Sequence, residues 1–300
     1  MKKILITGHK GFVGKHFVKF IQNKYPEATI TGCDIKDGLL YDCRNLFKED
    51  TNIYDLVIHL AAIVGGRQTI ENDPLAVATD LSIDSEMFNW AVKTKQKKIV
   101  YFSSSAAYPI ILQTEDKKHK LKESDINLLD IKTPDFSYGW SKLTGEMLAN
   151  YAKNNYGLNV YVFRPFSGFG FDQDLDYPFP SFLNRVINKV DKFQIWGDGT
   201  QVRDFIYIDD VIKGVFKTIE LNIQSPVNLG TGRPVSFTEL ANIMFKIYNY
   251  YPKNDIDYLL DKPKGVMYRC SDNSLLKSYY SFDNELEDIL REHKNVYNSL

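Results

Sequence analysis

The sequence predicts an α/β fold in which a doubly wound parallel sheet of the Rossmann type precedes a smaller C-terminal α/β domain. Two observations lead to this prediction. Apolar runs rich in β-branched residues alternate with longer helical patterns through the first 165 residues. This alternation is typical of parallel strands that are covered by helices on both faces. The first apolar run also leads directly into a glycine-rich turn that opens a helix, as the first unit of such folds requires.

The individual elements follow in chain order from the same patterns. Strands are predicted where short apolar runs end at turn residues, and helices where apolar residues recur at helical spacing. The expected strands cover 2–7, 28–34, 55–62, 98–105 and 159–165, and the expected helices cover 12–24, 73–94 and 136–155. Strands separated by helices in this way pair in parallel, so both faces of the sheet should be covered.

The alternation loosens after Pro165, where turn-rich pieces separate shorter strands and helices. We therefore expect a dinucleotide-binding domain over 1–165, with a returning segment at about 204–222, and a mainly substrate-binding domain over 166–300. No Gly/Ser-rich linker separates the two parts. The ligand cleft is accordingly expected between them.

The bulk composition excludes several classes of partner. The chain has 300 residues, 44% of them hydrophobic, and 37 basic against 38 acidic residues give a formal net charge of −1. Such a balance offers no attraction to nucleic acid or to an anionic membrane, and no apolar stretch is long enough to span a bilayer. Cys33, Cys43 and Cys270 fit neither a disulfide framework nor a zinc site. We expect a cytoplasmic protein without a metal ion.

A phosphate-binding turn follows the first strand. Gly8, Gly11 and Gly14 have the spacing G-x-x-G-x-x-G, and Phe12 and Val13 begin the helix. The glycines allow a tight turn, a close approach of the backbone to a pyrophosphate, and packing of the helix against the strand. The N–H groups and the positive dipole end of the helix then face the phosphates.

An acidic residue at the end of the second strand indicates which dinucleotide is bound. Asp34 ends the run ATITGCD, where a carboxylate accepts hydrogen bonds from the ribose hydroxyls and repels the 2′-phosphate of NADP. NAD is therefore favoured over NADP, although Lys10 and Lys36 lie nearby in the sequence. Asp42 is a candidate to hold the adenine, with a solvated aspartate as the equal alternative.

The candidate catalytic residues lie at a strand end and on a helix. Tyr138 and Lys142 are four residues apart on the predicted helix, so both side chains share one face. An ammonium beside the phenol, together with a positively charged nicotinamide, favours the phenolate and makes tyrosine usable as a base. The serines 103–105 end a strand at the sheet edge where ligands bind, and one of them can orient a substrate hydroxyl.

These segments resemble the extended short-chain dehydrogenase/reductase family, in particular its NAD-dependent nucleotide-sugar epimerases and dehydratases. The likeness covers essentially the whole chain through TGHKGFVG, HLAA, FSSSAAYP, YGWSK, WGDGTQVRDFIYIDDV and NLGTG. Within the family it is greatest to GDP-mannose 3,5-epimerases and GDP-L-fucose synthases, through VGG at 64–66, LKESD at 121–125 and the run 263–277. The resemblance implies an enzyme that binds a nucleotide-diphosphate sugar, oxidises C4 of the sugar and forms a homodimer.

The same resemblance assigns roles to single residues. Ser104, which stands four residues before Tyr108, would orient the substrate hydroxyl, Tyr138 would remove its proton, and Lys142 would tune the tyrosine and hold NAD. Further cofactor contacts are implied at Leu60, Ala61 and Ala62, and substrate contacts at Ser104, Ser105, Ser167, Arg203 and Arg269, the two arginines clamping the diphosphate. Tyr177 and Phe179 are candidates to flank the nucleotide base.

Departures from the family pattern narrow the reaction. Ala106 stands where the 3,5-epimerases and fucose synthases share a cysteine that takes part in proton transfer. The lysine or histidine that pairs with that cysteine is also not evident after the strand that ends at Pro165, where the segment offers Asp172, Asp174 and Asp176 instead. Ser105 and Ala106 also replace the two acids of 4,6-dehydratases. The interpretation is C4 epimerisation of a GDP- or UDP-sugar. A 3,5-epimerase and a 4-ketoreductase or dehydrogenase remain alternatives, with a non-enzymatic NAD sensor as the rival class.

Overall fold

A computed structural model describes residues 1–63 and 73–298. Its centre is a six-stranded sheet in the order β11-β6-β4-β3-β1-β2, and every pairing in it is parallel. These strands are Lys3–Thr7 (β1), Thr29–Cys33 (β2), Leu56–His59 (β3), Lys98–Phe102 (β4), Asn159–Pro165 (β6) and Val227–Leu229 (β11). The α/β class and the parallel sheet expected from the sequence are confirmed.

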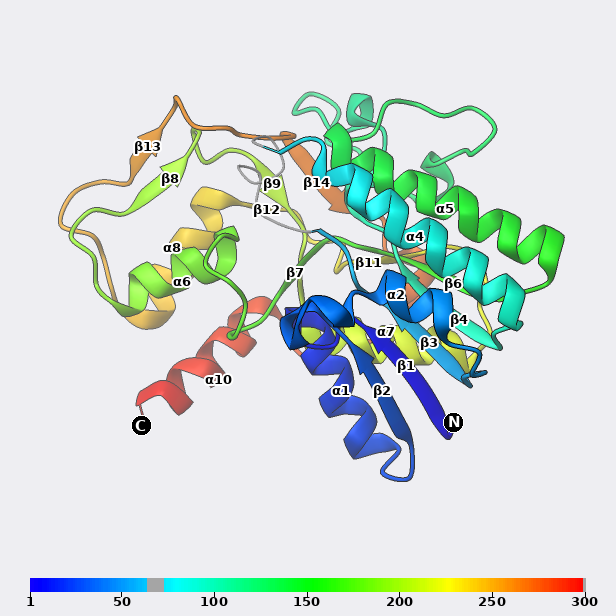
Figure 1. Ribbon diagram of the computed structural model, residues 1–300. Coiled ribbons are helices and arrows are strands. Elements are labelled where there is room, and N and C mark those ends of the chain that lie inside the picture. The colour runs from blue at the N-terminus through cyan, green and yellow to red at the C-terminus, as the bar shows by residue number, and fades with distance from the viewer. Residues whose placement is uncertain (64–72, 299–300) are drawn as a thin grey trace.

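Helices cover both faces of this sheet, as Figure 1 shows. One face carries Cys43–Glu49 (α2), Ala76–Thr94 (α4) and Phe136–Tyr156 (α5), and the other carries Phe12–Lys24 (α1) and Ile208–Glu220 (α7). The strands β1 and β6 and the helix α1 begin and end within a residue of their predicted bounds, whereas the helix expected from Asp73 begins at Ala76.

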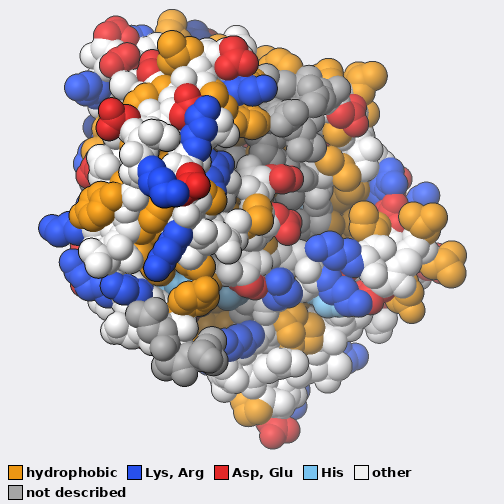
Figure 2. Space-filling view, turned by 90° about the vertical axis from the view of Figure 1, so that its left-hand side faces the viewer, with side chains coloured by type: hydrophobic (Ala, Val, Ile, Leu, Met, Phe, Trp, Pro, Cys, Tyr) orange, Lys and Arg blue, Asp and Glu red, His pale blue; other side chains and the backbone are white. Residues whose placement is uncertain are grey.

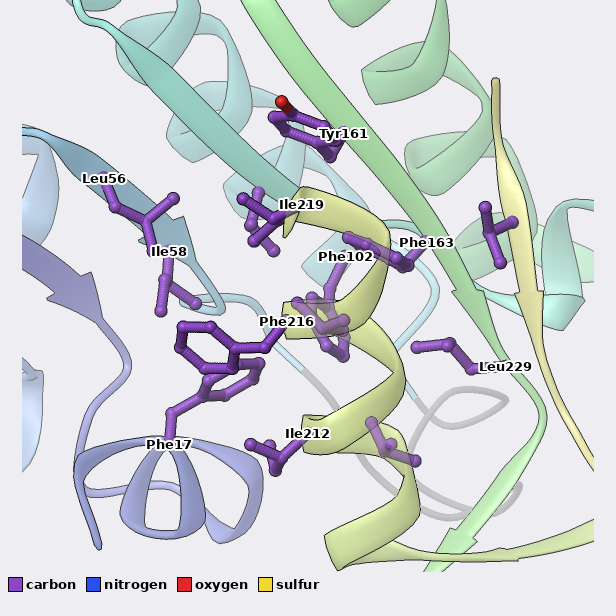
Figure 3. Packing of buried hydrophobic residues seen from close by; sticks show 14 of the residues in the cluster. Phe17, Leu56, Ile58, Phe102, Tyr161, Phe163, Ile212, Phe216, Ile219 and Leu229 are labelled. Atoms are coloured by element: carbon purple, nitrogen blue, oxygen red, sulfur yellow. The ribbon is translucent and has the colours of Figure 1, made fainter. Parts of the chain in front are cut away.

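The apolar side of α7 forms the centre of the first core (Figure 3). Phe216 and Ile212 of α7 face Phe17 of α1, and Ile58 and Phe163 reach the same cluster from the sheet. Complete burial of such a side chain stabilises the fold by about 1.5–3 kcal/mol. A second cluster fills the space between the opposite sheet face and α2, α4 and α5.

The remaining elements form a second part beside the sheet (Figure 1). Its main helices are Pro178–Ile187 (α6), Phe237–Tyr248 (α8) and Leu286–Asn298 (α10), which pack around an aromatic core. The short helix Ser274–Lys277 (α9) packs beside β11. Its strands are short and lie in three small sheets. They are Lys120–Leu121 (β5), Ser167–Phe169 (β7), Gln194–Trp196 (β8), Val202–Arg203 (β9), Phe205–Tyr207 (β10), Val235–Ser236 (β12), Asp257–Leu259 (β13) and Tyr268–Ser271 (β14).

Five 3-10 turns complete the described elements: Ile35–Asp37 (η1), Leu39–Tyr41 (η2), Ser105–Ala107 (η3), Ile110–Leu112 (η4) and Glu123–Asp125 (η5). Two of them follow strands of the large sheet at the ends where parallel strands place ligands. These are η1 after β2 and η3 after β4, and they position the residues of the candidate site.

Candidate active site

The glycine-rich turn forms a cradle that has no room for side chains. Gly8 has φ +73°, and a Cβ atom there would lie 2.9 Å from the Ala61 nitrogen. A Cβ atom on Gly14 would lie 2.2 Å from the Gly8 carbonyl oxygen. The Gly11 N–H donates to that same oxygen at 3.1 Å. The missing side chains therefore let the start of α1 and the segment after β3 close around one turn, the arrangement that a dinucleotide pyrophosphate needs.

Other predicted cofactor residues lie around this cradle. Gly11 is the N-cap of α1, so Phe12 and Val13 form its first turn, which contains no acidic residue to compete with an anion. Leu60, Ala61 and Ala62 directly follow β3, and the N–H groups of Leu60 and Ala61 reach the Thr7 hydroxyl at 3.3 Å.

Asp34 is placed as an NAD-selecting carboxylate should be. It directly follows β2 as the N-cap of η1, is 8% exposed, and accepts the N–H groups of Lys10 and Lys36, both at 2.9 Å. The Lys10 ammonium forms an ion pair with Asp37 and is thereby engaged within the protein. The Asp34 carboxylate can accept hydrogen bonds from ribose hydroxyls but would repel a 2′-phosphate, and the Lys10 ammonium is already paired with Asp37.

Asp42 has a structural role in addition to the predicted one. Its carboxylate caps α2 by accepting the Arg44 N–H at 2.9 Å, and the Arg44 guanidinium pairs with it at 2.5 Å. Hydrogen bonding from Arg44 lowers the pKa of Asp42, with burial opposing. The adenine contact of Asp42 stays a prediction.

Ser104, Tyr138 and Lys142 come together at the end of β4 and the start of α5. Ser104 caps η3 and accepts the Ala106 N–H at 3.0 Å, and its hydroxyl lowers the pKa of the Tyr138 phenol. Lys142 lies one helical turn after Tyr138, and its ammonium is 5.7 Å from the centroid of the Tyr138 ring. The lysine is only 4% exposed, so its charge acts on the phenol with little screening by water.

The electrostatics of this group combine opposing influences. Burial raises the pKa of Tyr138 above the ordinary tyrosine value, whereas Lys142 and the Ser104 hydrogen bond lower it. Burial lowers the pKa of Lys142, but Tyr138, Asp84 and Asp80 raise it, and the net result is a raised pKa. The lysine is therefore charged at neutral pH and opposes the effect of burial, but the net pKa of Tyr138 stays raised, so the protein residues alone do not give the lowering expected from the sequence.

The neighbouring serines have other surroundings. Ser103 donates to Glu146 at 2.5 Å within the buried interior, and Glu146 pairs with Arg164 at 2.7 Å. Ser105 lies buried within η3. Of the three serines, Ser104 is the one that acts on the pKa of Tyr138, and its role toward a substrate hydroxyl stays a prediction.

The two predicted phosphate-binding arginines are neighbours in one small sheet. Arg203 of β9 and Arg269 of β14 are register partners. The Arg203 guanidinium donates to the Val266 carbonyl at 2.9 Å. Arg269 pairs with Asp135 at 2.6 Å and so connects this sheet to the residue before α5. Ser167 begins β7, next to Gly168, whose α-carbon faces open space.

Two aromatic residues that the sequence pairs have different surroundings. Phe179 is 2% exposed and packs against Phe169 with ring centroids 4.1 Å apart, so the prediction that it flanks a base is wrong. Tyr177 interacts electrostatically with Tyr138, which puts its phenol near the catalytic group. The predicted segment at 64–66 lies outside the described residues.

The sequence analysis missed two carboxylates behind the catalytic pair. Asp80 and Asp84 of α4 are 2% and 1% exposed, and both act electrostatically on Lys142. The two aspartates are four residues apart on the buried face of α4, which is otherwise apolar. Acidic residues at that spacing within an apolar pattern are the sequence signal that could have identified these buried carboxylates.

The outer surface carries charges of both signs. Figure 2 shows lysine, arginine and acidic side chains interspersed over the face that it presents, in line with the net charge of −1. Among the described residues, no helix is long and apolar enough to cross a membrane.

A parallel sheet, a glycine cradle with an acidic strand end, and a Ser-Tyr-Lys group define a dinucleotide-dependent enzyme of sugar or alcohol chemistry. Residues 4–230 match the model of the NAD dependent epimerase/dehydratase family, and the chain belongs to that family. The protein is therefore an enzyme, and NAD is its cofactor, as Asp34 predicts.

Individual relatives share the architecture along nearly the whole chain. The chain is 28% identical to a GDP-mannose 3,5-epimerase of Oryza sativa subsp. indica, over 92% of this chain and 75% of the relative. It is 30% identical to a putative UDP-glucose 4-epimerase of Methanocaldococcus jannaschii, over 89% and 88%. The solved UDP-glucose 4-epimerase of Thermotoga maritima superposes with a TM-score of 0.80 at 23% identity, covering 99% of each chain.

Proposed function

We propose that this enzyme epimerises C4 of a GDP- or UDP-sugar through a 4-keto intermediate. The observation that carries the proposal is the buried Lys142 ammonium 5.7 Å from the centroid of the Tyr138 ring, with Ser104 acting on the same phenol. This group suffices to remove and return one hydroxyl proton.

The protein residues divide the reaction between them. Tyr138, as the phenolate, takes the proton of the C4 hydroxyl while the C4 hydrogen leaves as a hydride, and it returns the proton when C4 is reduced again. When bound, NAD supplies a hydride acceptor at C4 and a donor for the return. Ser104 orients the C4 oxygen, and Lys142 stabilises the phenolate. Return of the hydride to the other sugar face inverts C4 without net consumption of cofactor.

The surroundings of this group support inversion at C4 alone. Ala106 lies buried in η3 and offers a methyl group where proton exchange at C3 or C5 would need an acid or base. Ser103 is engaged with Glu146. Proton exchange next to a ketone requires a base of matched pKa on each side of the ring, and these positions supply none.

We further propose that Arg203 and Arg269 hold the diphosphate and that Ser105 and Ser167 line the sugar site. Support comes from the register pairing of the arginines. Arg269 is paired with Asp135 in this structure, so binding a diphosphate would require that ion pair to be shared or exchanged.

A GDP-sugar 3,5-epimerase is the second candidate. Its support is the Tyr177 phenol near Tyr138, together with the named activity of the plant relative. Burial raises the pKa of Tyr177, so Tyr177 would serve as a proton donor. A 4-ketoreductase or dehydrogenase is the third candidate, and it differs from an epimerase because it consumes the cofactor.

Proton NMR of the enzyme with NAD and a panel of GDP- and UDP-sugars in D₂O tests the proposal. We expect inversion at C4, no deuterium in the ring and no net NADH. The Tyr138→Phe variant should lose turnover by at least about a hundredfold, because the proton acceptor is removed. Deuterium at C3 or C5 would establish the 3,5-epimerase instead, and stoichiometric NADH or NAD would establish a dehydrogenase or reductase.

Two features support a homodimer in a reducing compartment. Leu81 of α4 and Trp140 and Tyr151 of α5 are exposed on adjacent helices (Figure 1). We propose that this face pairs with its copy across a two-fold axis.

The cysteines are free and buried, which supports a cytoplasmic location.

A further inference from the structure

The buried side of the catalytic lysine faces two carboxylates and an aromatic ring. Lys142 places its ammonium 5.6 Å from the centroid of the Tyr101 ring and 5.7 Å from that of Tyr138. Asp84 accepts a hydrogen bond from the Tyr101 hydroxyl at 2.5 Å. The ring that bounds the lysine on one side is thus fixed by a carboxylate from the facing helix.

The crossing of α4 and α5 is shaped around this contact. Gly145 lies on α5 where a Cβ atom would be 1.7 Å from the Tyr101 hydroxyl and 2.7 Å from an Asp84 carboxylate oxygen. Any side chain at 145 would displace the pair. The helices therefore approach closely enough to enclose Asp84, which is 1% exposed.

A chain of hydrogen bonds connects Asp84 to the cofactor cradle. His59 Nε2 lies 3.2 Å from the Asp84 carboxylate, and its Nδ1 lies 2.8 Å from the Thr7 hydroxyl. The Thr7 oxygen also accepts the N–H groups of Leu60 and Ala61. A histidine protonated at Nε2 satisfies every partner in this chain, since Thr7 can donate to Nδ1 while it accepts the two N–H groups.

The second carboxylate adds charge on the same side. Asp80 stands one turn before Asp84 and accepts the Ile63 N–H at 2.5 Å. Burial raises the pKa of Asp80 and Lys142 opposes this, whereas for Asp84 the Lys142 charge and the hydrogen bonds from His59 and Tyr101 outweigh burial and lower the pKa. Two carboxylates thus face one ammonium in a region closed to water, where charge acts strongly.

We propose that Asp84 is a positioning residue for the catalytic pair: it fixes the Tyr101 ring that bounds the Lys142 ammonium and, with Asp80, places buried negative charge against the lysine and the phenol. This inference rests on the proposed role of Tyr138 as the base. The carboxylates oppose the phenolate, so they restrain the effect of Lys142. The described titratable and charged groups that face the pair are His59, Asp80, Asp84, Tyr101, Glu146 and Tyr177.

The sign of the effect follows from charge. Replacing Asp84 with asparagine keeps a side chain of the same shape that accepts from Tyr101, and removes one negative charge near the phenol. The phenolate then forms more readily, so the ionisation midpoint of Tyr138 should fall by about one pH unit. A residue that only fills space would leave this midpoint unchanged.

The test is a spectroscopic pH titration of tyrosinate absorbance on the full-length enzyme, with and without NAD. Tyr138 is isolated by subtracting the curve of the same protein carrying Tyr138→Phe. We compare the wild type with Asp84→Asn, and with Asp80→Asn as a second variant in case the first does not fold. Both should lower the midpoint by about half a unit to one unit.

Asp210→Asn is the matched control. Asp210 is also a buried aspartate that accepts a tyrosine hydroxyl at 2.5 Å, from Tyr280, but it lies on α7 at the opposite sheet face. It should leave the Tyr138 midpoint in place. An unchanged or raised midpoint in Asp84→Asn or Asp80→Asn, or an equal shift in Asp210→Asn, overturns the inference. Because the titration needs no substrate, its failure is distinguishable from failure of the proposed reaction.

Discussion

Gly14→Ala is the perturbation that most directly probes the cofactor cradle. The added Cβ atom would lie 2.2 Å from the Gly8 carbonyl oxygen and 2.7 Å from the His9 α-carbon. Both are backbone atoms that no rotamer change can move. Ordinary contact begins near 3.4 Å, so α1 must withdraw from the turn by about 3.4 − 2.2 = 1.2 Å.

A displacement of that size acts on both binding and stability. The N–H groups at the start of α1 would leave the position that serves a pyrophosphate, and a misplacement of about 1 Å can cost a hundredfold in a positioned site. We expect NAD affinity to fall about 10- to 100-fold, which corresponds to about 1.4–2.7 kcal/mol. Overpacking should lower the free energy of unfolding by about 1–3 kcal/mol, less a small gain in helix propensity.

Gly214→Ala provides the matched control. Gly214 is also a helical glycine, in α7, but a Cβ atom there would meet Leu229 and Leu276 at 3.5 and 3.6 Å, which is ordinary contact. This variant should keep wild-type NAD affinity and gain up to about 1 kcal/mol in stability. Calorimetric NAD titration and thermal unfolding measure both effects. If Gly14→Ala binds NAD like the wild type, the cradle does not hold the pyrophosphate and the reasoning fails.

Three further outcomes follow from the described contacts. Asp34→Ala should reduce the preference for NAD over NADP at least about tenfold in paired binding titrations, because a fixed carboxylate no longer opposes a 2′-phosphate. Glu146→Leu should cost about 3–5 kcal/mol in urea unfolding, since Arg164 would remain buried without its partner, and adding Arg164→Met should recover part of the loss. Two carboxylates, Asp209 at 3.7 Å and Asp172 at 2.9 Å from the His16 ring nitrogens, raise the pKa of His16 above its ordinary value although burial opposes this. This stabilisation is therefore complete below pH 6.5 and lost as the pH rises through the raised pKa, and His16→Gln should flatten stability across that window.

Most of the large sheet could be predicted from sequence because its signals are local, although the expected strands do not include the short edge strand β11. The run from Lys3 to Lys24 combines an apolar strand, glycines at fixed spacing and a helical repeat, and the structure reproduces its bounds nearly residue for residue. The small sheet of β12, β9, β14 and β5 could not be predicted in this way. Its strands have two to four residues, too few to show an alternating pattern, and their pairing joins segments up to about 150 residues apart in the chain.

The polar interior was beyond sequence reasoning for a related reason. Nothing local distinguishes Glu146 of α5 from the exposed acids of other helices, and its partner Arg164 lies on the strand β6. His16 likewise meets Asp172 only because α1 and the loop after β7 are brought together by the fold. Such pairs depend on which faces are buried, and burial of a charge is decided by its distant partner.

The relative position of Ser104 and Tyr138 depends both on the residue types in the sequence and on backbone contacts in the fold. The sequence supplies the residue types but no distance between them. The structure sets the distance through backbone contacts, because the Asp135 N–H donates to the Ala106 carbonyl at 2.9 Å, and a Cβ atom at Gly139 would lie 2.4 Å from that same oxygen. The glycine after the tyrosine therefore lets the start of α5 rest against the turn that carries the serine. A side chain at 139 would separate the hydroxyl from the phenol without altering either catalytic group, so the glycine in the Tyr-Gly-x-Ser-Lys segment is part of the catalytic geometry.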